Sequence, residues 1–308
     1  MDTTHPVLTD VLSSLGYECE IHHEKNYDWF AEHVANYEGI IVRSRIRIDK
    51  ALIFNAVNLK FIGRLGSGLE NIDVAYAVSR GIECFNSPEG NRDAVGEHAV
   101  GMLLDLFHNI TRANNEVKNG VWNREANRGM ELFGKVVGII GYGNMGSAFA
   151  KRLNGFGCRV LAFDKYKTGF SDQYVRESDM DEIFRETDIL SFHVPLKEDT
   201  RKLFNTDYLS RFSKKIWIIN TARGHVVETG ALVTGLTSGK VLGACLDVLE
   251  YESLSFDSIA AENYPMELRY LMNAGNVIMS PHIAGLTAES HFKLASVLAD
   301  KIKTYILK

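Results

Sequence analysis

The sequence predicts an α/β protein with a doubly wound parallel sheet and a second, smaller α/β domain. The first observation is an apolar, β-branched run at residues 136–140 that leads directly into G-x-G-x-x-G at residues 141–146. The second is the alternation of apolar runs with helical patterns from residue 136 onward, which is typical of a parallel sheet covered on both faces. The third is a shorter alternation of the same kind before residue 90. Together they predict two domains in a chain of 308 residues.

The larger domain is expected to contain six parallel strands, which complete a doubly wound sheet. The six apolar runs lie at residues 136–140, 158–163, 188–194, 215–220, 241–248 and 276–280. A helical pattern at residues 147–153 follows the first run, as in a β-α-β unit. Another at residues 94–117 has one apolar side and is expected to form a long helix that bridges the two domains.

The smaller domain is expected to alternate strands with helices. The strands are expected at residues 17–21, 39–42, 60–65 and 81–84, and the helices at 6–15, 27–37, 50–56 and 74–80. An amphipathic helix expected at residues 287–307 must bury its apolar face on a domain already present, and we assign it to this one. The smaller domain then comprises residues 1–94 and 286–308, and the larger domain comprises residues 95–285.

The start of the smaller domain is unusual, because small α/β domains commonly open with a strand. Residues 2–6, Asp-Thr-Thr-His-Pro, instead predict a turn and the start of a helix. Either a first strand lies upstream of residue 1 or the domain tolerates its loss, and the sequence leaves both open.

The glycine pattern predicts a bound dinucleotide, because each glycine has a physical role there. Gly141 permits a tight turn, Gly143 leaves room for a pyrophosphate close to the backbone, and Gly146 lets the helix pack closely on the strand. The start of the helix offers N–H groups and the positive end of its dipole to the phosphates.

An acidic residue at the end of the second strand indicates which dinucleotide is bound. Asp164 stands where a carboxylate accepts hydrogen bonds from the ribose hydroxyls and repels a 2′-phosphate, so the pattern favours NAD over NADP. Lys165 and Lys167 follow closely and soften that preference. The alternative is that Asp164 is only a solvated strand end.

The bulk composition is that of an ordinary globular protein, with 45% hydrophobic residues and a net charge of −5. The negative charge argues against a nucleic-acid partner, which needs concentrated cations. No apolar run approaches the length of a membrane span, so no membrane association is expected. Four scattered cysteines form no C-x-x-C pair, and we expect them to be reduced in a cytoplasmic protein.

Three histidines follow strands at the edge where open α/β sheets bind their ligands. His193, His225 and His282 are therefore candidates for proton transfer near neutral pH. The alternative for each is a hydrogen-bonded structural histidine. A metal site is disfavoured, because no close pair of ligands occurs.

Other charged residues at the same edge complete the candidate chemistry. Arg223, in Asn-Thr-Ala-Arg-Gly at the end of a strand, offers a planar fork suited to a carboxylate. Glu250 and Glu252 lie beyond the fifth strand, where either would orient a histidine.

Seven blocks of the sequence resemble, in the same order, the motifs of the D-2-hydroxyacid dehydrogenase family. They are GSGLENID at 66–73, NRDAVGEH at 91–98, GYGNMG at 141–146, HVPL at 193–196 with Thr200, NTARG at 220–224, LDV at 246–248 and SPHIAG at 280–285. The resemblance implies a Rossmann NAD-binding domain at residues 95–285. It also implies a smaller, discontinuous, flavodoxin-like substrate domain at residues 1–94 and 286–308.

The resemblance also implies a catalytic trio of Arg223, Glu252 and His282. His282 donates a proton to the keto oxygen as hydride arrives from the nicotinamide, and it is the base in the oxidative direction. Glu252 holds the other ring nitrogen and favours the protonated ring. Arg223 holds the substrate carboxylate and polarises the carbonyl. His193 and His225 are left with supporting roles.

Further positions follow from the same resemblance. The implied NAD-binding residues are Gly141, Gly143, Asn144, Met145, Gly146, Asp164, Thr221, Ala222, Asp247 and Gly285. Backbone groups around Ser67, Gly68 and Leu69 are implied to hold the substrate carboxylate, and no metal is implied.

The chain departs from the family pattern at a few positions. Ser253 follows Glu252 where the family has proline, so Glu250 remains a fallback for the catalytic acid. Glu70 stands where aspartate is usual, and the segment at residues 253–276 is longer than usual.

Two arginines bear on the substrate. Arg43 and Arg45 follow the strand at 39–42, where they are either solvated cations or an anion site able to hold a phosphate or a second carboxylate. This block resembles the 3-phosphoglycerate dehydrogenases, which favours a similar enzyme of serine biosynthesis. The alternative is a glyoxylate or hydroxypyruvate reductase.

Two further expectations concern function class and assembly. The same fold and site occur in NADH-sensing corepressors, so a binding protein is the alternative from another class, and turnover of keto acids discriminates the two. A homodimer is expected by family analogy, with the bridging helix and residues 120–124 in its interface. Trp122 is either a buried anchor there or packed within its own subunit.

Overall fold

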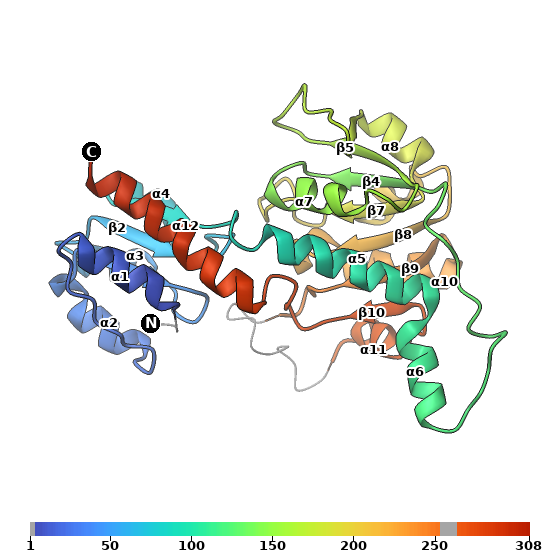
Figure 1. Cartoon of the computed structure of the whole chain (residues 1–308), viewed down its shortest axis with the longest axis horizontal. Helices are drawn as coiled ribbons and strands as arrows, with labels where there is room; N and C mark the ends of the chain where they lie inside the picture. Colours follow the sequence, from blue (N-terminus) through green and yellow to red (C-terminus); the bar gives the residue numbers. More distant parts are fainter. Residues whose placement is uncertain (1–3, 253–263) are drawn as a thin grey trace. The chain divides into compact units, whose positions relative to one another are not determined.

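The computed structural model describes residues 4–252 and 264–308, which form two compact α/β units. Among the described residues, unit 1 contains 4–92 and 286–308, and unit 2 contains 93–252 and 264–285. Each unit is built around its own parallel sheet (Figure 1).

Unit 2 is a Rossmann sheet of parallel strands in the order β10-β9-β8-β7-β4-β5-β6. The strands are β4 (Val136–Ile140), β5 (Arg159–Phe163), β6 (Arg176–Glu177), β7 (Ile189–Phe192), β8 (Ile216–Asn220), β9 (Val241–Leu246) and β10 (Val277–Met279). The order reverses between β4 and β7, so a ligand is expected at the carboxyl ends of these two strands. The six expected strands are confirmed, and β6 is an addition. It was missed because two polar residues carry no hydrophobic pattern.

Helices cover both faces of this sheet. The helices of unit 2 are α5 (Arg92–His108), α6 (Ile110–Lys118), α7 (Asn144–Arg152), α8 (Met180–Glu186), α9 (Thr206–Ser210), the short 3-10 helix η2 (Gly224–Val226), α10 (Thr229–Ser238) and α11 (Met266–Asn273). Of these, α6 buries no residue. Side chains of α5 and α7 pack into one apolar cluster, and those of α8, α9, α10 and α11 pack into another. Because both faces of the sheet are buried, its inner strands are largely apolar; β4 and β7 are buried at every position.

The long helix expected at residues 94–117 is wrong as a single element. It breaks at Asn109, whose φ of +54° is left-handed, so α5 ends at His108 and α6 begins at Ile110. Asparagine is among the few residues that adopt this conformation readily. An apolar pattern that continues across the break does not reveal it.

Unit 1 contains a parallel sheet in the order β1-β2-β3. Its elements are α1 (Pro6–Ser14), α2 (Tyr27–His33), the 3-10 helix η1 (Val34–Asn36), β1 (Gly39–Val42), α3 (Lys50–Asn55), β2 (Phe61–Arg64), α4 (Val74–Ser79), β3 (Glu83–Asn86) and α12 (Ala288–Ile306). One face of the sheet packs against α2 and α3, and the other against α1 and α12. Helices α1 and α12 lie side by side (Figure 1). A capping box of Thr287 and Ser290 begins α12.

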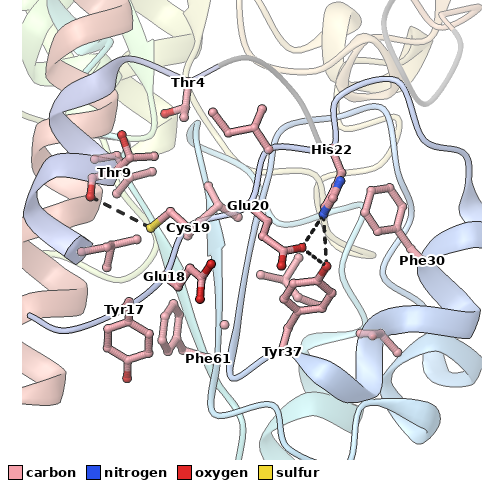
Figure 2. A pocket seen from close by; sticks show the side chains of 17 residues that line it. Thr4, Thr9, Tyr17, Glu18, Cys19, Glu20, His22, Phe30, Tyr37 and Phe61 are labelled. Carbon is pink, nitrogen blue, oxygen red and sulfur yellow. Dashed lines mark hydrogen bonds and ion pairs between the residues drawn. The ribbon is translucent and has the colours of Figure 1, made fainter.

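Three expectations for unit 1 need correction. Residues 17–21 form no strand, because none of the described strands pairs with them. Side chains hold this segment instead, and Glu20 accepts a hydrogen bond from the Tyr37 hydroxyl at 2.6 Å (Figure 2). The helix expected at 27–37 divides into α2 and η1, and the strand expected at 81–84 begins two residues later, at Glu83.

Other expectations concern the chain as a whole. Its four cysteines are free. Within residues 4–252 and 264–308, no helix is long and apolar enough to cross a bilayer. The departure at Ser253 lies outside the described residues, as does the first part of the segment at 253–276.

Candidate active site

The glycine loop joins β4 to α7 at the switch point of unit 2. Gly141 has a φ of +92°, and a Cβ there would lie 2.7 Å from the carbonyl oxygen of His193. A Cβ at Gly146 would lie 2.1 Å from the carbonyl oxygen of Gly141. The protein's own packing therefore requires both glycines. A Cβ at Gly143 would meet nothing within 4 Å, so that glycine leaves the open approach that a phosphate needs. No side chain caps the start of α7, which begins here.

Asp164 connects the end of β5 to this loop. One of its carboxylate oxygens accepts a hydrogen bond of 2.8 Å from the Tyr142 N–H. The other accepts from the N–H groups of Tyr166 and Lys167, at 2.9 and 3.1 Å. Lys165 forms an ion pair with Asp199. These contacts fix the carboxylate beside the glycine loop, where a ribose is expected from the sequence.

Arg223 lies in the loop after β8, and Asn220 shapes that loop. The Asn220 side chain donates to the Arg223 carbonyl at 2.9 Å and accepts from the Ala222 N–H at 3.1 Å. A Cβ at Gly224 would lie 1.9 Å from the Leu249 carbonyl oxygen, so the loop packs tightly on the segment after β9. The Thr221 hydroxyl is buried and has no partner among the described residues, as expected of a group that binds a ligand.

His282 and Glu252 form a hydrogen-bonded pair in the segments after β10 and β9. The distance from Nδ1 of His282 to Oε2 of Glu252 is 2.7 Å, and both side chains are largely buried. The other carboxylate oxygen of Glu252 accepts from the Leu249 N–H. The carboxylate is thus held by the same segment against which Gly224 packs. This arrangement orients an imidazole, as in proton-transfer sites.

Asp247 holds the turn that carries His282. Its carboxylate accepts from the Ser280 hydroxyl at 2.7 Å and from the N–H groups of Ile283 and Ala284, each at 2.9 Å. Its carbonyl accepts from the His282 N–H at 2.8 Å. His282 has a left-handed φ of +54°, and these bonds stabilise that conformation. That Asp247 also binds NAD stays a prediction; its observed contacts hold the turn that carries the histidine.

The surroundings of Asp247 lower its pKa. Burial alone would raise the pKa, but hydrogen bonds from His98, Ser280 and two backbone amides outweigh it. Because the pKa of Asp247 is lower in the folded protein, its charge contributes stability above the unfolded value of about 3.9. That contribution is lost as the pH falls towards the folded value.

We expect Asp247→Asn to lower the free energy of unfolding by about 2–3 kcal/mol at pH 7, because a buried N–H loses a charged acceptor. Denaturant unfolding from pH 7 into the acid range checks this, with the difference from wild type shrinking below about pH 3.9. Asp181→Asn, at a carboxylate that is 85% exposed, is the matched control with little effect. A difference that stays constant or grows on acidification would contradict the account.

The other candidate residues at this edge have hydrogen-bond or ion-pair partners of their own. His193 is buried with Nε2 2.8 Å from the Ser191 hydroxyl, and burial lowers its pKa to about 3, so it is neutral and unsuited to donate a proton. The Glu250 carboxylate accepts from the N–H and hydroxyl of Thr229 and lies 3.8 Å from Nδ1 of His225. Glu250 thus fixes the start of α10, and the geometry favours Glu252 as the partner of His282.

The anion-binding candidates of unit 1 lie where β1 and β2 end. Arg43 follows β1, and Asn71 donates to its carbonyl at 2.8 Å. Ser67 donates from its hydroxyl to Asn91 at 2.9 Å and accepts at its carbonyl from Asn86 at 2.6 Å. The loop that contains Gly68 and Leu69 is therefore connected to its neighbours by the side chains of Asn71, Asn86 and Asn91. The Arg45 guanidinium donates to the Lys25 carbonyl at 2.7 Å, which is a structural contact within unit 1.

Some residues of these candidate sites were not predicted from the sequence. Arg64 ends β2 and is 9% exposed, and its guanidinium occupies the space in which a Cβ of Gly66 would lie. An arginine inside the apolar run Phe-Ile-Gly-Arg-Leu was a usable signal, because a cation is rarely buried without a purpose. Asn220 and Ser280 were missed as positioning residues, and nothing in their local pattern indicates that role.

Comparison with known proteins adds an independent result. Residues 100–284 match the family model described as D-isomer specific 2-hydroxyacid dehydrogenase, NAD binding domain. A hydroxypyruvate reductase of Thermotoga maritima is 38% identical over 271 residues, which cover 87% of this chain and 85% of that protein. A D-3-phosphoglycerate dehydrogenase of Archaeoglobus fulgidus is 34% identical over 295 residues, which cover 95% of this chain. The chain spans about half the length of that relative, 54%.

A solved structure shows a similar fold. The D-lactate dehydrogenase of Aquifex aeolicus, complexed with NAD and lactic acid, superposes with a TM-score of 0.82 at 26% identity. The match covers 98% of this chain and 92% of that one. The resemblance inferred from the sequence motifs is thereby confirmed.

Proposed function

The chain belongs to the family of D-isomer specific 2-hydroxyacid dehydrogenases, as an NAD-dependent oxidoreductase, and we propose that His282 is its proton donor and acceptor. The observation that carries this proposal is the His282–Glu252 pair at 2.7 Å. Nδ1 of His282 is engaged by the carboxylate, so Nε2 is the atom that exchanges a proton with the substrate oxygen. In keto-acid reduction, Nε2 donates to the carbonyl oxygen, and in oxidation it accepts the hydroxyl proton.

Arg223 is proposed to bind the substrate carboxylate with its planar guanidinium and to polarise the adjacent carbonyl. Asn220 fixes the backbone of this loop on both sides of Ala222, and the contact of Gly224 with Leu249 joins it to the segment that holds Glu252. The backbone at Arg223 and the partner of His282 are therefore connected through one segment, which keeps the distance between the two side chains fixed. A fixed distance suits a substrate whose carboxylate and keto group are adjacent.

The chain's residues fit NAD, which supplies or accepts the hydride when bound. The open space at Gly143 and the uncapped start of α7 would accept the pyrophosphate, together with Asn144 and Met145. Asp164 would hold the ribose, and the buried, unpartnered Thr221 hydroxyl would contact the cofactor. Ala222 and Gly285 are proposed neighbours of the nicotinamide half.

The proposed substrate is 3-phosphoglycerate or a similar phosphorylated 2-hydroxy acid. Arg43 follows β1 and the buried Arg64 ends the neighbouring β2. Their charges favour a second anionic group, with the backbone at Ser67–Leu69 holding the carboxylate. Hydroxypyruvate or glyoxylate is the second candidate, which is favoured by the hydroxypyruvate reductase that matches over 85% of its own length. The role of unit 1 as the substrate domain is part of this proposal.

A substrate panel tests these alternatives. Reduction of hydroxypyruvate, glyoxylate and pyruvate is followed with NADH and NADPH in parallel, and 3-phosphoglycerate oxidation is followed with NAD. The proposal predicts NAD-linked turnover of 3-phosphoglycerate with the highest kcat/KM of the panel. Turnover of hydroxypyruvate or glyoxylate without 3-phosphoglycerate would establish the second candidate instead.

Arg43→Ala tests the anion site directly. We expect kcat/KM for the phosphorylated substrate to fall on the order of 30-fold, as for loss of a charge-assisted contact of about 2 kcal/mol, with little change for hydroxypyruvate. Arg47→Ala, at an exposed arginine in the same loop, is the matched control. Equal losses on both substrates would argue that Arg43 supports the fold of the loop rather than an anion.

A homodimer is proposed from the exposed apolar side chains between residues 120 and 134. Trp122 is 78% exposed and Phe133 is 75% exposed, so the alternative that Trp122 packs within its own subunit is wrong. We expect Trp122→Ser to weaken the dimer by about 30-fold, as for an interface anchor worth about 2 kcal/mol. Sedimentation over a concentration series measures it, with Val57→Ser as an exposed control in unit 1. A monomeric wild type, or an unaffected dimer, would contradict the proposal.

A further inference from the structure

Two loops of unit 2 meet beside the carboxyl end of β4. One loop follows β5 and contains Lys165 and Tyr166, and the other follows β7 and contains Lys197 and Asp199. β5 and β7 pair with opposite edges of β4 and run parallel to it, so both loops leave the sheet at the same end (Figure 1). Contacts between these loops therefore lie close to the glycine loop, which follows β4 itself.

An ion pair connects the two loops. Nζ of Lys165 donates to the Asp199 carboxylate at 2.5 Å, and the Tyr166 hydroxyl lies 3.4 Å from the same oxygen. Nζ of Lys165 and Nζ of Lys197 lie 5.7 and 5.1 Å from the centroid of the Tyr166 ring. The hydrogen bond between Lys165 and Asp199 raises the pKa of the lysine and lowers that of the aspartate, so both are charged at neutral pH.

Lys165 is also the cation that directly follows Asp164. The Asp164 carboxylate accepts from the N–H groups of Tyr166 and Lys167, so the chain turns around the carboxylate and Lys165 is part of that turn. A 2′-phosphate on a ribose held by Asp164 would lie in the neighbourhood of this turn, and lysine is a common partner of phosphate. The second lysine, Lys167, donates to the Tyr142 carbonyl at 3.1 Å and holds the glycine loop instead.

We propose that Asp199 is a specificity-determining residue, which disfavours NADP by engaging Lys165. A 2′-phosphate would have to displace the Asp199 carboxylate from the lysine and would then lie near that negative charge. Asp164 supplies another negative charge, so two aspartates from different loops act on the same group of the cofactor. This inference rests on the proposed contact between Asp164 and the ribose.

Cofactor binding to the unliganded protein tests the role of Asp199, with fluorescence titration of NADH and NADPH. Asp199→Asn leaves the Lys165 charge uncompensated, so the Kd for NADPH is expected to fall about five- to tenfold, as for one unit charge at an exposed site. The Kd for NADH is expected to change much less, because the 2′-hydroxyl is neutral. Lys165→Met added to Asp199→Asn is expected to abolish the gain.

Two controls separate a specific contact from other effects. Glu198→Gln removes the same charge from the neighbouring exposed residue and is expected to leave the preference for NADH nearly unchanged. Exposed charges are screened by salt, so the gain in Asp199→Asn, measured as the ratio of the two Kd values, is expected to shrink at high ionic strength. The Tm is expected to stay close to that of the wild type, because an exposed ion pair adds little stability.

Several outcomes would overturn the proposal. Equal tightening of NADH and NADPH in Asp199→Asn would mean that the ion pair obstructs the cofactor rather than selects it. A gain that persists without Lys165, a gain of the same size in Glu198→Gln, or no gain at all would also count against it. Asp164→Asn tests the premise separately: weaker NADH binding supports the ribose contact, whereas unchanged NADH binding would place the ribose elsewhere.

Discussion

His282→Asn is expected to lower kcat for keto-acid reduction by about 10³–10⁴-fold, because the proton donor is lost. Asparagine is the informative replacement, since residue 282 has a φ of +54° and asparagine adopts that conformation more readily than most residues. The backbone of the turn is therefore preserved, and NADH affinity is expected to stay within a few-fold of wild type. Steady-state kinetics together with NADH titration by fluorescence measures both quantities.

The matched pair Glu252→Gln and Glu250→Gln controls this prediction. Glu252 contacts the His282 ring, so its loss is expected to lower kcat by about 10–100-fold, the usual cost of removing an orienting carboxylate. Glu250 contacts Thr229 instead, so Glu250→Gln is expected to have a much smaller effect. A larger loss in Glu250→Gln, or near-normal turnover in His282→Asn, would contradict the assigned roles.

Arg223→Gln is expected to lower kcat/KM by about 10³-fold, because both the carboxylate anchor and the polarising charge are removed. Arg223→Lys keeps the charge but loses the planar fork, so an intermediate loss of about 10²-fold is expected. The KM for NADH is expected to change little in either variant. Kinetics with hydroxypyruvate at fixed NADH measures the difference.

An exposed arginine provides the control for this series. Arg201→Gln, in the loop before α9, removes the same charge outside the described contacts of Arg223. Equal losses in Arg201→Gln and Arg223→Gln would mean that net charge rather than a specific contact is responsible. Full activity of Arg223→Lys would exclude recognition by a fork of two hydrogen bonds.

The sheet of unit 2 could be predicted from the sequence because burial on both faces demands apolar residues. β4 matches its expected bounds, and the other predicted strands differ only at their ends. The glycine loop was equally predictable, since Gly141 and Gly146 are required by contacts that no other residue allows. Hydrophobic pattern and steric necessity are both local properties of the sequence.

The elements that were missed depend on pairing or on single dihedral angles. β6 is two polar residues that become a strand only because β5 lies beside them. The break at Asn109 rests on one left-handed residue within a continuous apolar pattern. Residues 17–21 have a strand pattern but no described strand as partner, and pairing is a property of the neighbouring chain rather than of the segment.

The candidate residues of the site came from the sequence, but their connections did not. The resemblance implied His282, Arg223 and Glu252, with Glu250 as a fallback, and the contact of 2.7 Å between His282 and Glu252 supports that choice. The positioning role of Asp247 could not be predicted from the sequence. Its carboxylate accepts hydrogen bonds from Ser280, Ile283 and Ala284, which are far from it in the sequence. Such networks are fixed by the tertiary fold, so residue type alone does not reveal them.

Isotope transfer tests the central claim most directly. The enzyme is given a 2-keto acid with NADH deuterated at the transferring position of C4, and the product is analysed by mass spectrometry and chiral chromatography. The account predicts one deuterium at C2 of a D-2-hydroxy acid for each NADH consumed, with at least a 10³-fold slower reaction in His282→Asn. Tight NADH binding without deuterium transfer to any keto acid of the panel, or equal transfer in His282→Asn, would contradict it.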